Sequence, residues 1–314
     1  MLRPEQRSVS CPNGLSIACQ VYRGSGREGK TPIISLHGYL DNSATWELCA
    51  PALTEAGHDV IAMDFPGHGK SGHVSQDSWY SLLDYPQYVM WVAKALLGDK
   101  CFSLLGHSLG GGVALLVAAS FPERVQSLVM VEAIGPFTLS PTGAVTHLKR
   151  SFTSRETLLA ASADKVWPSP ESAVKARVSN AGMGGNLMTI TEEAARRLVM
   201  RAVKDEGEGR VSFTHDSKVK AYSPGYLSED AVKAFLAAVK CPCLAISGAT
   251  GFPLNSAARE RMAILGDKLS HAHLSGSHHL HLDAHTAPEV LAELLLFYRK
   301  VAQEASDEDK KSKY

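Results

Sequence analysis

The sequence lacks several features that would have placed it in a special class of proteins. Its 314 residues contain no run near the roughly 18 apolar residues of a membrane span, and residues 1–7 lack the apolar core of a secretory signal. Basic and acidic residues number 32 each, so the net charge gives no support for binding to nucleic acid. The six cysteines are too sparse for a disulfide framework. These absences predict a cytoplasmic globular protein without nucleic-acid partners.

What the sequence does contain is an alternation of strand-like and helical segments. Residues 8–22 alternate apolar and polar side chains around Asn13-Gly14, which predicts an antiparallel hairpin. Further strands are predicted at 32–36, 59–65, 102–105, 127–131, 244–247 and 271–274, and helices at 85–97, 109–120 and 287–302. This order predicts an α/β fold with a mostly parallel sheet that has helices on both faces.

One connection is much longer than the others. More than one hundred residues separate the strand ending at Val131 from the strand beginning at Leu244. A structureless loop of that length is implausible in a compact domain, and the segment contains helical patterns. These include 191–203 and 229–239, with a loop-like stretch at 180–186. We therefore predict a core of residues 1–136 and 240–304, an inserted helical cap at 137–239 and a charged, disordered tail at 305–314.

The tail also bears on location. It ends in Ser-Lys-Tyr at 312–314, which differs at its last position from the peroxisomal Ser-Lys-Leu signal. A peroxisomal location is therefore kept as the weaker alternative to the cytoplasm.

The clearest chemical motif is Gly106-His-Ser-Leu-Gly110, between a predicted strand and a predicted helix. In this context the pattern is typical of a nucleophile elbow, which lifts the hydroxyl of Ser108 above the sheet. The helix amino terminus directs N–H groups at the place where an oxyanion would develop. The loop at His37-Gly38-Tyr39-Leu40 follows an earlier strand, so the predicted oxyanion donors are the backbone N–H groups of Tyr39 and Leu109. A structural turn is the alternative interpretation.

A general base is expected after the last strand, in a segment rich in histidine. His278 follows the turn at Gly276-Ser277 and is the predicted base, with His279 as its neighbouring competitor. His271 and His273 lie inside the predicted strand and are expected to be packed or surface residues. A zinc site is a weaker alternative, because no third ligand stands out at a defined spacing.

The acidic partner of that histidine is harder to place. The loop after the strand at 244–247, where such an acid usually lies, reads from Gly248 to Asn255 and contains no carboxylate. Glu132 instead ends the apolar strand at 127–131, where a carboxylate is costly unless it is paired or functional. Glu132 is therefore the predicted acid, and a salt bridge to the cap is the alternative.

Taken together, these residues resemble those of the α/β-hydrolase superfamily, and more narrowly those of the serine hydrolase-like proteins. The resemblance rests on the segments 37–42, 62–69, 106–111, 209–216 and 276–278, together with His281. It implies serine-hydrolase chemistry on small acyl substrates, with Ser108 as nucleophile and His278 as base.

The mechanism that we predict is cleavage of carboxylic esters or thioesters through an acyl-enzyme, without cofactor or metal. Carbon–carbon bond hydrolysis is a chemically close alternative. A different class of function also stays open, namely a ligand-binding or signalling protein with the same fold and little turnover. The sequence leaves the oligomeric state open.

Overall fold

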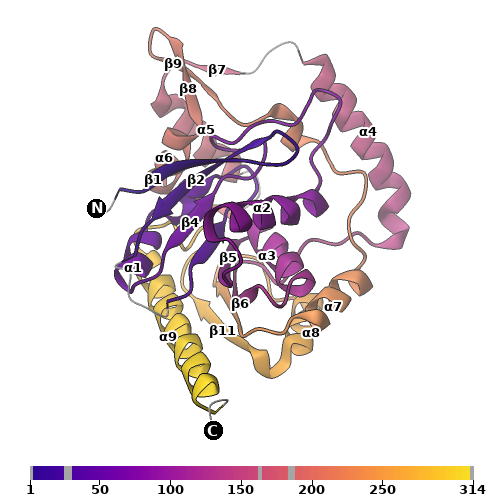
Figure 1. Ribbon diagram of the computed structural model, residues 1–314. Helices are drawn as coiled ribbons and strands as arrows, with labels where there is room; N and C mark the ends of the chain where they lie inside the picture. Colours follow the sequence, from indigo (N-terminus) through magenta and orange to yellow (C-terminus); the bar gives the residue numbers. More distant parts are fainter. Residues whose placement is uncertain (1–2, 25–29, 162–164, 183–187, 312–314) are drawn as a thin grey trace.

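The central element of the computed structural model is a twisted sheet (Figure 1). The structure describes residues 3–24, 30–161, 165–182 and 188–311, and the sheet within them has eight strands. Its strands, in spatial order, are β1 (Glu5–Ser10), β2 (Ser16–Tyr22), β4 (Val60–Met63), β3 (Ile33–Leu36), β5 (Phe102–His107), β6 (Val125–Val131), β10 (Cys243–Gly248) and β11 (Leu269–Leu274). β2 pairs antiparallel with β1 and β4, and the other neighbours are parallel. The predicted hairpin and the mostly parallel sheet are confirmed.

Helices cover both faces of this sheet because its inner strands are apolar on both sides. Alternate residues of a strand point to opposite faces, so Ile34 packs in one core cluster and Ile33 in the other. The first cluster includes residues of α2 (Tyr85–Leu97), α3 (Leu109–Ser120), α7 (Glu229–Ala238) and α8 (Ser256–Leu265). The second includes residues of α1 (Ala50–Glu55) and α9 (Ala287–Lys311).

Most of the segment between β6 and β10 lies beside the sheet, in the upper part and at the right of Figure 1, whereas α7 at its end packs on the sheet. The segment contains α4 (Ala144–Ala160), α5 (Pro170–Gly182), α6 (Glu192–Arg201) and a three-stranded antiparallel sheet of β7 (Val166–Trp167), β9 (Arg210–Phe213) and β8 (Val203–Gly207). Residues of α5, α6 and β9 form a core of their own. We refer to residues 137–228 as the insertion.

Short 3-10 helices complete the chain: η1 (Ser43–Trp46), η2 (Leu82–Asp84), η3 (Pro141–Gly143), η5 (Ser217–Lys220) and η6 (Gly266–Lys268). The bounds predicted for α2 and α3 agree with the structure. Helix α9 continues to Lys311 and includes most of the segment expected to be a disordered tail, while 312–314 lie outside the described residues. The loop expected at 180–186 begins inside α5, and 183–187 also lie outside the described residues. Among the described residues, no helix is both long and apolar enough to cross a bilayer.

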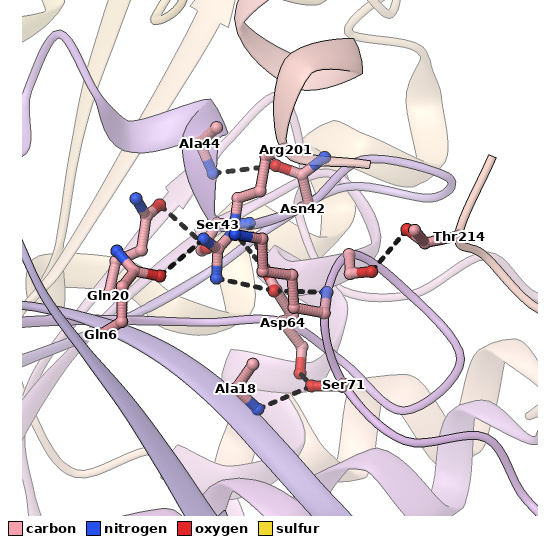
Figure 2. Close-up of polar contacts among 12 residues, drawn as sticks. Gln6, Ala18, Gln20, Asn42, Ser43, Ala44, Asp64, Ser71, Arg201 and Thr214 are labelled. Carbon is pink, nitrogen blue, oxygen red and sulfur yellow. Dashed lines mark hydrogen bonds and ion pairs between the residues drawn. The ribbon is translucent and has the colours of Figure 1, made fainter. Parts of the chain in front are cut away.

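A buried ion pair joins the insertion to the carboxyl end of β4 (Figure 2). Asp64 follows β4 and is fully buried, and Arg201 ends α6. The Arg201 guanidinium donates Nη2–H to Asp64 Oδ2 at 2.8 Å and Nε–H to Oδ1 at 3.2 Å. The backbone N–H groups of Ser43 and Lys70 donate to the same carboxylate at 2.7 and 2.9 Å. Both oxygens of Asp64 therefore accept hydrogen bonds, from the insertion and from two loops of the core.

Removing this charge should destabilise the fold. Burial alone would raise the pKa of Asp64, but Arg201 and the other donors hold the pKa below its ordinary value. The stabilisation is then complete above about pH 3.9 and is lost as the pH falls through the lower pKa of the folded state. We expect Asp64→Asn to lower the free energy of unfolding by roughly 3–5 kcal/mol at pH 7 and by less below about pH 3. Urea unfolding at the two pH values measures both effects.

Glu171→Gln is the matched control, because Glu171 forms an exposed ion pair with Arg196 in the same insertion. It should change the free energy of unfolding little, because an exposed ion pair contributes little to stability. Equal losses in the two variants would contradict the anchoring role of Asp64.

Candidate active site

Ser108 occupies a strained turn at the carboxyl end of the sheet. It lies between the last residue of β5 and the first residue of α3, with φ of 51° and ψ of −114°. Positive φ is rare for a residue with a side chain, and it persists only where the surroundings enforce it. Here the Ser108 N–H donates to the Val131 carbonyl at 2.9 Å, and the Ser108 carbonyl accepts from Gly112 N–H at 3.1 Å.

The flanking glycines allow β5 and α3 to approach closely enough for this turn. A Cβ atom on Gly106 would lie 2.3 Å from the Gly110 carbonyl oxygen, and one on Gly110 would lie 2.4 Å from the Leu36 carbonyl oxygen. Both contacts are with backbone, which cannot move aside. The pattern that singled out Ser108 in the sequence is therefore required by the packing around it.

Glu132 lies one strand away, directly after β6, and its carboxylate is buried. Its backbone also has positive φ, at 53°. Oε1 accepts from the N–H of Gly248 at 2.6 Å, and Oε2 accepts from the N–H of Phe252 at 2.8 Å. Oε2 is also 3.1 Å from Nδ1 of His278. The side chain therefore lies beside the histidine that the sequence predicts as the base.

The conformation of residues 248–252 explains why this loop carries no acid of its own. It curls around the Glu132 carboxylate, and a Cβ atom on Gly251 would lie 2.2 Å from Glu132 Oε2. The space that a side chain at position 251 would enter is already filled by the carboxylate arriving from β6. Glu132 thus reaches the place where the sequence pattern was expected to supply an acid.

His278 and His279 point to different partners. His278 is buried, and its ring lies between His107 and Phe252 at centroid distances of 4.6 and 4.4 Å. His279 Nε2 instead lies 3.5 Å from Asp41 Oδ2 and 3.4 Å from the Arg177 guanidinium. This geometry favours His278 over His279 as the partner of Glu132.

A second buried acid, Asp41, stabilises the histidine-rich segment that contains His278. Its Oδ1 accepts from Arg177 of α5 at 2.8 Å, and its Oδ2 lies 3.8 Å from His107 Nδ1. Burial opposes ionisation, but Arg177 and His279 hold the pKa of Asp41 well below its ordinary value. His107 Nε2–H donates to the His278 carbonyl at 2.9 Å, and burial lowers the pKa of His107 so that it stays neutral. This network fixes the backbone that carries His278.

Sequence reasoning missed Asp41, Arg177 and His107 as supporting residues. Asp41 and Arg177 are 136 positions apart, and neither belongs to a motif that indicates the other. The available signal was the position of Asp41 two residues beyond Tyr39, in the same loop as the predicted oxyanion donor.

The two predicted oxyanion donors belong to two different segments of the core. Leu109 is the first residue of α3, and Tyr39 lies in the loop after β3. Tyr39, Leu109 and Ser108 all line one cavity. Within the described chain, neither backbone N–H donates to a carbonyl or a side chain, so both are available to a ligand.

The cavity has a volume of about 720 Å³ and is walled by both the core and the insertion. Its lining is mainly aromatic and aliphatic and includes Tyr85, Ile134, Phe137, Tyr222, Tyr226 and Phe252. Glu132 and Ser108 lie at its base on the sheet. A pocket of this kind suits a small ligand with an apolar body and one polar centre.

The remaining late histidines have separate surroundings. His271 and His273 of β11 lie 2.8 and 2.9 Å from Ser247 Oγ, and His281 Nε2 lies 2.7 Å from Thr45 Oγ1. Over the ranges that the structure describes, no three His, Cys, Asp or Glu side chains are arranged to hold a metal ion.

Comparison with known proteins gives matches along almost the whole chain. A family model described as the alpha/beta hydrolase fold matches residues 31–165. A serine hydrolase-like protein of Dictyostelium discoideum is 30% identical over 292 residues, which are 89% of this chain and 78% of that protein. A probable serine hydrolase of Drosophila melanogaster is 27% identical, over 95% of this chain and 88% of its own length. A hypothetical protein from Pseudomonas aeruginosa PAO1 has a solved structure with 30% identity and a TM-score of 0.82, over 94% of this chain and 99% of that one.

The contact between Gly251 and Glu132 can be tested without reference to any reaction. Gly251→Ala should push the carboxylate away from its donors and lower the free energy of unfolding by roughly 1–3 kcal/mol. Gly225→Ala is the control, because a Cβ atom there meets nothing within 4 Å. Thermal unfolding compares the two variants, and an unchanged midpoint for Gly251→Ala would contradict the close approach.

Proposed function

The chain belongs to the α/β-hydrolase superfamily, and from this premise we propose that it is a serine hydrolase acting on small carboxylic esters or thioesters. The fold and the relatives named serine hydrolase-like support a hydrolase in general. The observations that carry the finer proposal are the contact of His278 Nδ1 with the buried Glu132 carboxylate and a serine in a strained turn that lines the same cavity as Glu132. That arrangement is the one that a nucleophile, its base and an orienting acid require.

The reaction begins with attack of Ser108 Oγ on the acyl carbonyl. His278 Nε2 accepts the hydroxyl proton, while the N–H groups of Tyr39 and Leu109 stabilise the negative oxygen of the tetrahedral intermediate. The intermediate collapses, the bond to the alcohol or thiol breaks, and His278 returns the proton to that leaving group. The acyl group then remains bound to Ser108 as an ester.

Water completes the cycle by the same route. His278 removes a proton from the water as it attacks the acyl-enzyme, and the second tetrahedral intermediate releases the carboxylic acid. Ser108 regains its proton from His278. These steps need no cofactor and no metal ion.

Glu132 acts through His278. Its Oε2 accepts from Nδ1, which fixes the tautomer that leaves Nε2 free for the Ser108 proton, and its charge stabilises the imidazolium that forms. Its two backbone donors, Gly248 and Phe252, hold the carboxylate in place.

The lining of the cavity sets the class of acyl group. Aromatic and aliphatic walls favour an uncharged chain or ring over a charged one. The insertion supplies Tyr222 and Tyr226 to this wall, so it would limit substrate size.

A second candidate function is a ligand-binding protein with little turnover. One observation favours it: among the described residues Ser108 Oγ has no hydrogen-bond partner, His278 included. Catalytic hydrogen bonds are often long without substrate, so the same observation fits an enzyme.

A fluorophosphonate probe separates these two functions. We expect covalent labelling of the native protein and none of Ser108→Ala, because only an activated serine attacks the phosphorus centre. A panel of esters and thioesters of increasing chain length, assayed on the same two proteins, then defines the substrate class. A folded native protein that neither labels nor turns over any member would exclude the hydrolase.

Replacing the acid tests the role of Glu132. Glu132→Gln should lower kcat for a short-chain ester by roughly two orders of magnitude or more and change KM little, because the lost interaction orients the base rather than the substrate. Glu208→Gln serves as a control on an exposed side chain. If kcat of Glu132→Gln matched that of the control, Glu132 would have no part in the reaction.

A further inference from the structure

Helix α4 of the insertion turns its apolar side chains away from the molecule. The exposed fractions of Val145, Leu148, Phe152 and Leu159 are 84%, 42%, 51% and 69%. Figure 1 shows α4 at the right edge of the molecule, apart from the sheet. A surface helix normally buries its apolar stripe, so this orientation needs an explanation.

Polar side chains beside the stripe contact the rest of the chain. His147 donates Nε2–H to the Ser223 carbonyl at 2.7 Å, and Ser151 donates its hydroxyl to the Tyr222 carbonyl at 2.8 Å. The Arg155 guanidinium lies 4.7 Å from the centre of the Trp79 ring. These specific contacts fix the rotation of the helix, so the apolar stripe cannot simply turn inward.

The spacing of the stripe is that of a coiled-coil seam. Val145, Phe152 and Leu159 are seven residues apart, and Leu148 lies three residues after Val145. Val145, Phe152 and Leu159 thus take heptad position a, and Leu148 takes position d. These two positions repeat along the side of a helix that packs on another helix. Arg155 takes the remaining d position and is engaged with Trp79.

The charges beside the stripe indicate what kind of helix fits. Lys149 and Glu156 both occupy position e, are exposed, and have no ion-pair partner among the described residues. In an antiparallel pair of helices, e positions face e positions. Lys149 precedes Phe152 by three residues and Glu156 follows it by four, so the two lie at matching heights, within about 1.5 Å, when a second α4 is reversed about Phe152.

We infer that α4 is a self-association surface, on which α4 of a second copy packs antiparallel about a two-fold axis at Phe152. Val145 then meets Leu159 of the partner subunit, Phe152 meets its own equivalent, and Lys149 pairs with Glu156 of the partner subunit at both ends. The stripe is complementary to itself in shape and in charge, as a two-fold interface requires.

This association would act on the cavity. Helix α4 contacts the segment 222–226, and Tyr222, Ser223 and Tyr226 of this segment line the cavity. His147 also contacts the Tyr226 ring at a centroid distance of 5.0 Å. Pairing of two α4 helices therefore braces one wall of each cavity, and it does so whatever reaction takes place inside.

Sedimentation of the full chain tests the association. The stripe is short, so we expect a weak dimer, with a mass of twice the 33.7 kDa of one chain at about 100 µM and dissociation near 1 µM. Phe152→Glu should raise the dissociation constant roughly tenfold or more. Leu296→Glu is the control, because Leu296 is equally exposed, at 60%, but lies on α9. Circular dichroism verifies that each variant is folded.

Charge reversal tests the antiparallel register. Lys149→Glu and Glu156→Lys should each weaken self-association, because each places like charges together. The double variant should restore the dimer, and so should a mixture of the two single variants, since each supplies the charge that the other lost.

Two results would overturn the inference. One is a chain that stays monomeric at all concentrations while binding neutral lipid vesicles in a manner that Phe152→Glu abolishes, which would assign the stripe to a lipid surface. The other is a dimer that responds equally to Phe152→Glu and Leu296→Glu, or that the mixture of single variants fails to restore.

Discussion

The buried charge of Glu132 imposes the strictest condition on the carboxyl end of the sheet. A carboxylate taken out of water costs several kcal/mol or more unless donors replace the lost hydration. The backbone N–H of Gly248 at the end of β10, that of Phe252 in the loop that follows, and the ring of His278 meet that need. The loop can wrap so closely only because Gly251 has no side chain. The position of His278 next to Glu132 thus follows from the burial of one acid.

Two further buried acids act on the insertion in a similar manner. Asp41 pairs with Arg177 of α5, and Asp64 pairs with Arg201 of α6. Arginine suits this role because its planar fork can satisfy both carboxylate oxygens and stays charged when buried. A chain whose net charge is zero therefore places a few of its charges where they decide how the core and the insertion fit together.

The sequence allowed the sheet, α2, α3 and the Ser108 turn to be predicted, because periodicity and glycine positions are local signals. Glu132 was found by elimination, and the reason for its position emerged only from the Gly251 contact. Helix α8 was not predicted, although Asn255 caps its amino terminus. In the sequence, Asn255 was considered only as a residue that cannot replace the expected carboxylate. The pairing of Asp41 with Arg177 depends on tertiary structure alone. Periodicity likewise marks the stripe on α4 but cannot tell which way it faces.

The Asp41–Arg177 and Asp64–Arg201 pairs attach α5 and α6 firmly to the core, whereas α4 has no such ion pair with the core among the described residues. Lifting α5 or α6 from the core would strand a buried charge at each site, at a cost of roughly 3–5 kcal/mol per pair. Helix α4 is held to residues 222 and 223 of the insertion itself by hydrogen bonds and to Trp79 of the core by the Arg155 ring contact, which costs about 1 kcal/mol to break. Of these contacts with the core, the one made by α4 is therefore the least costly to break.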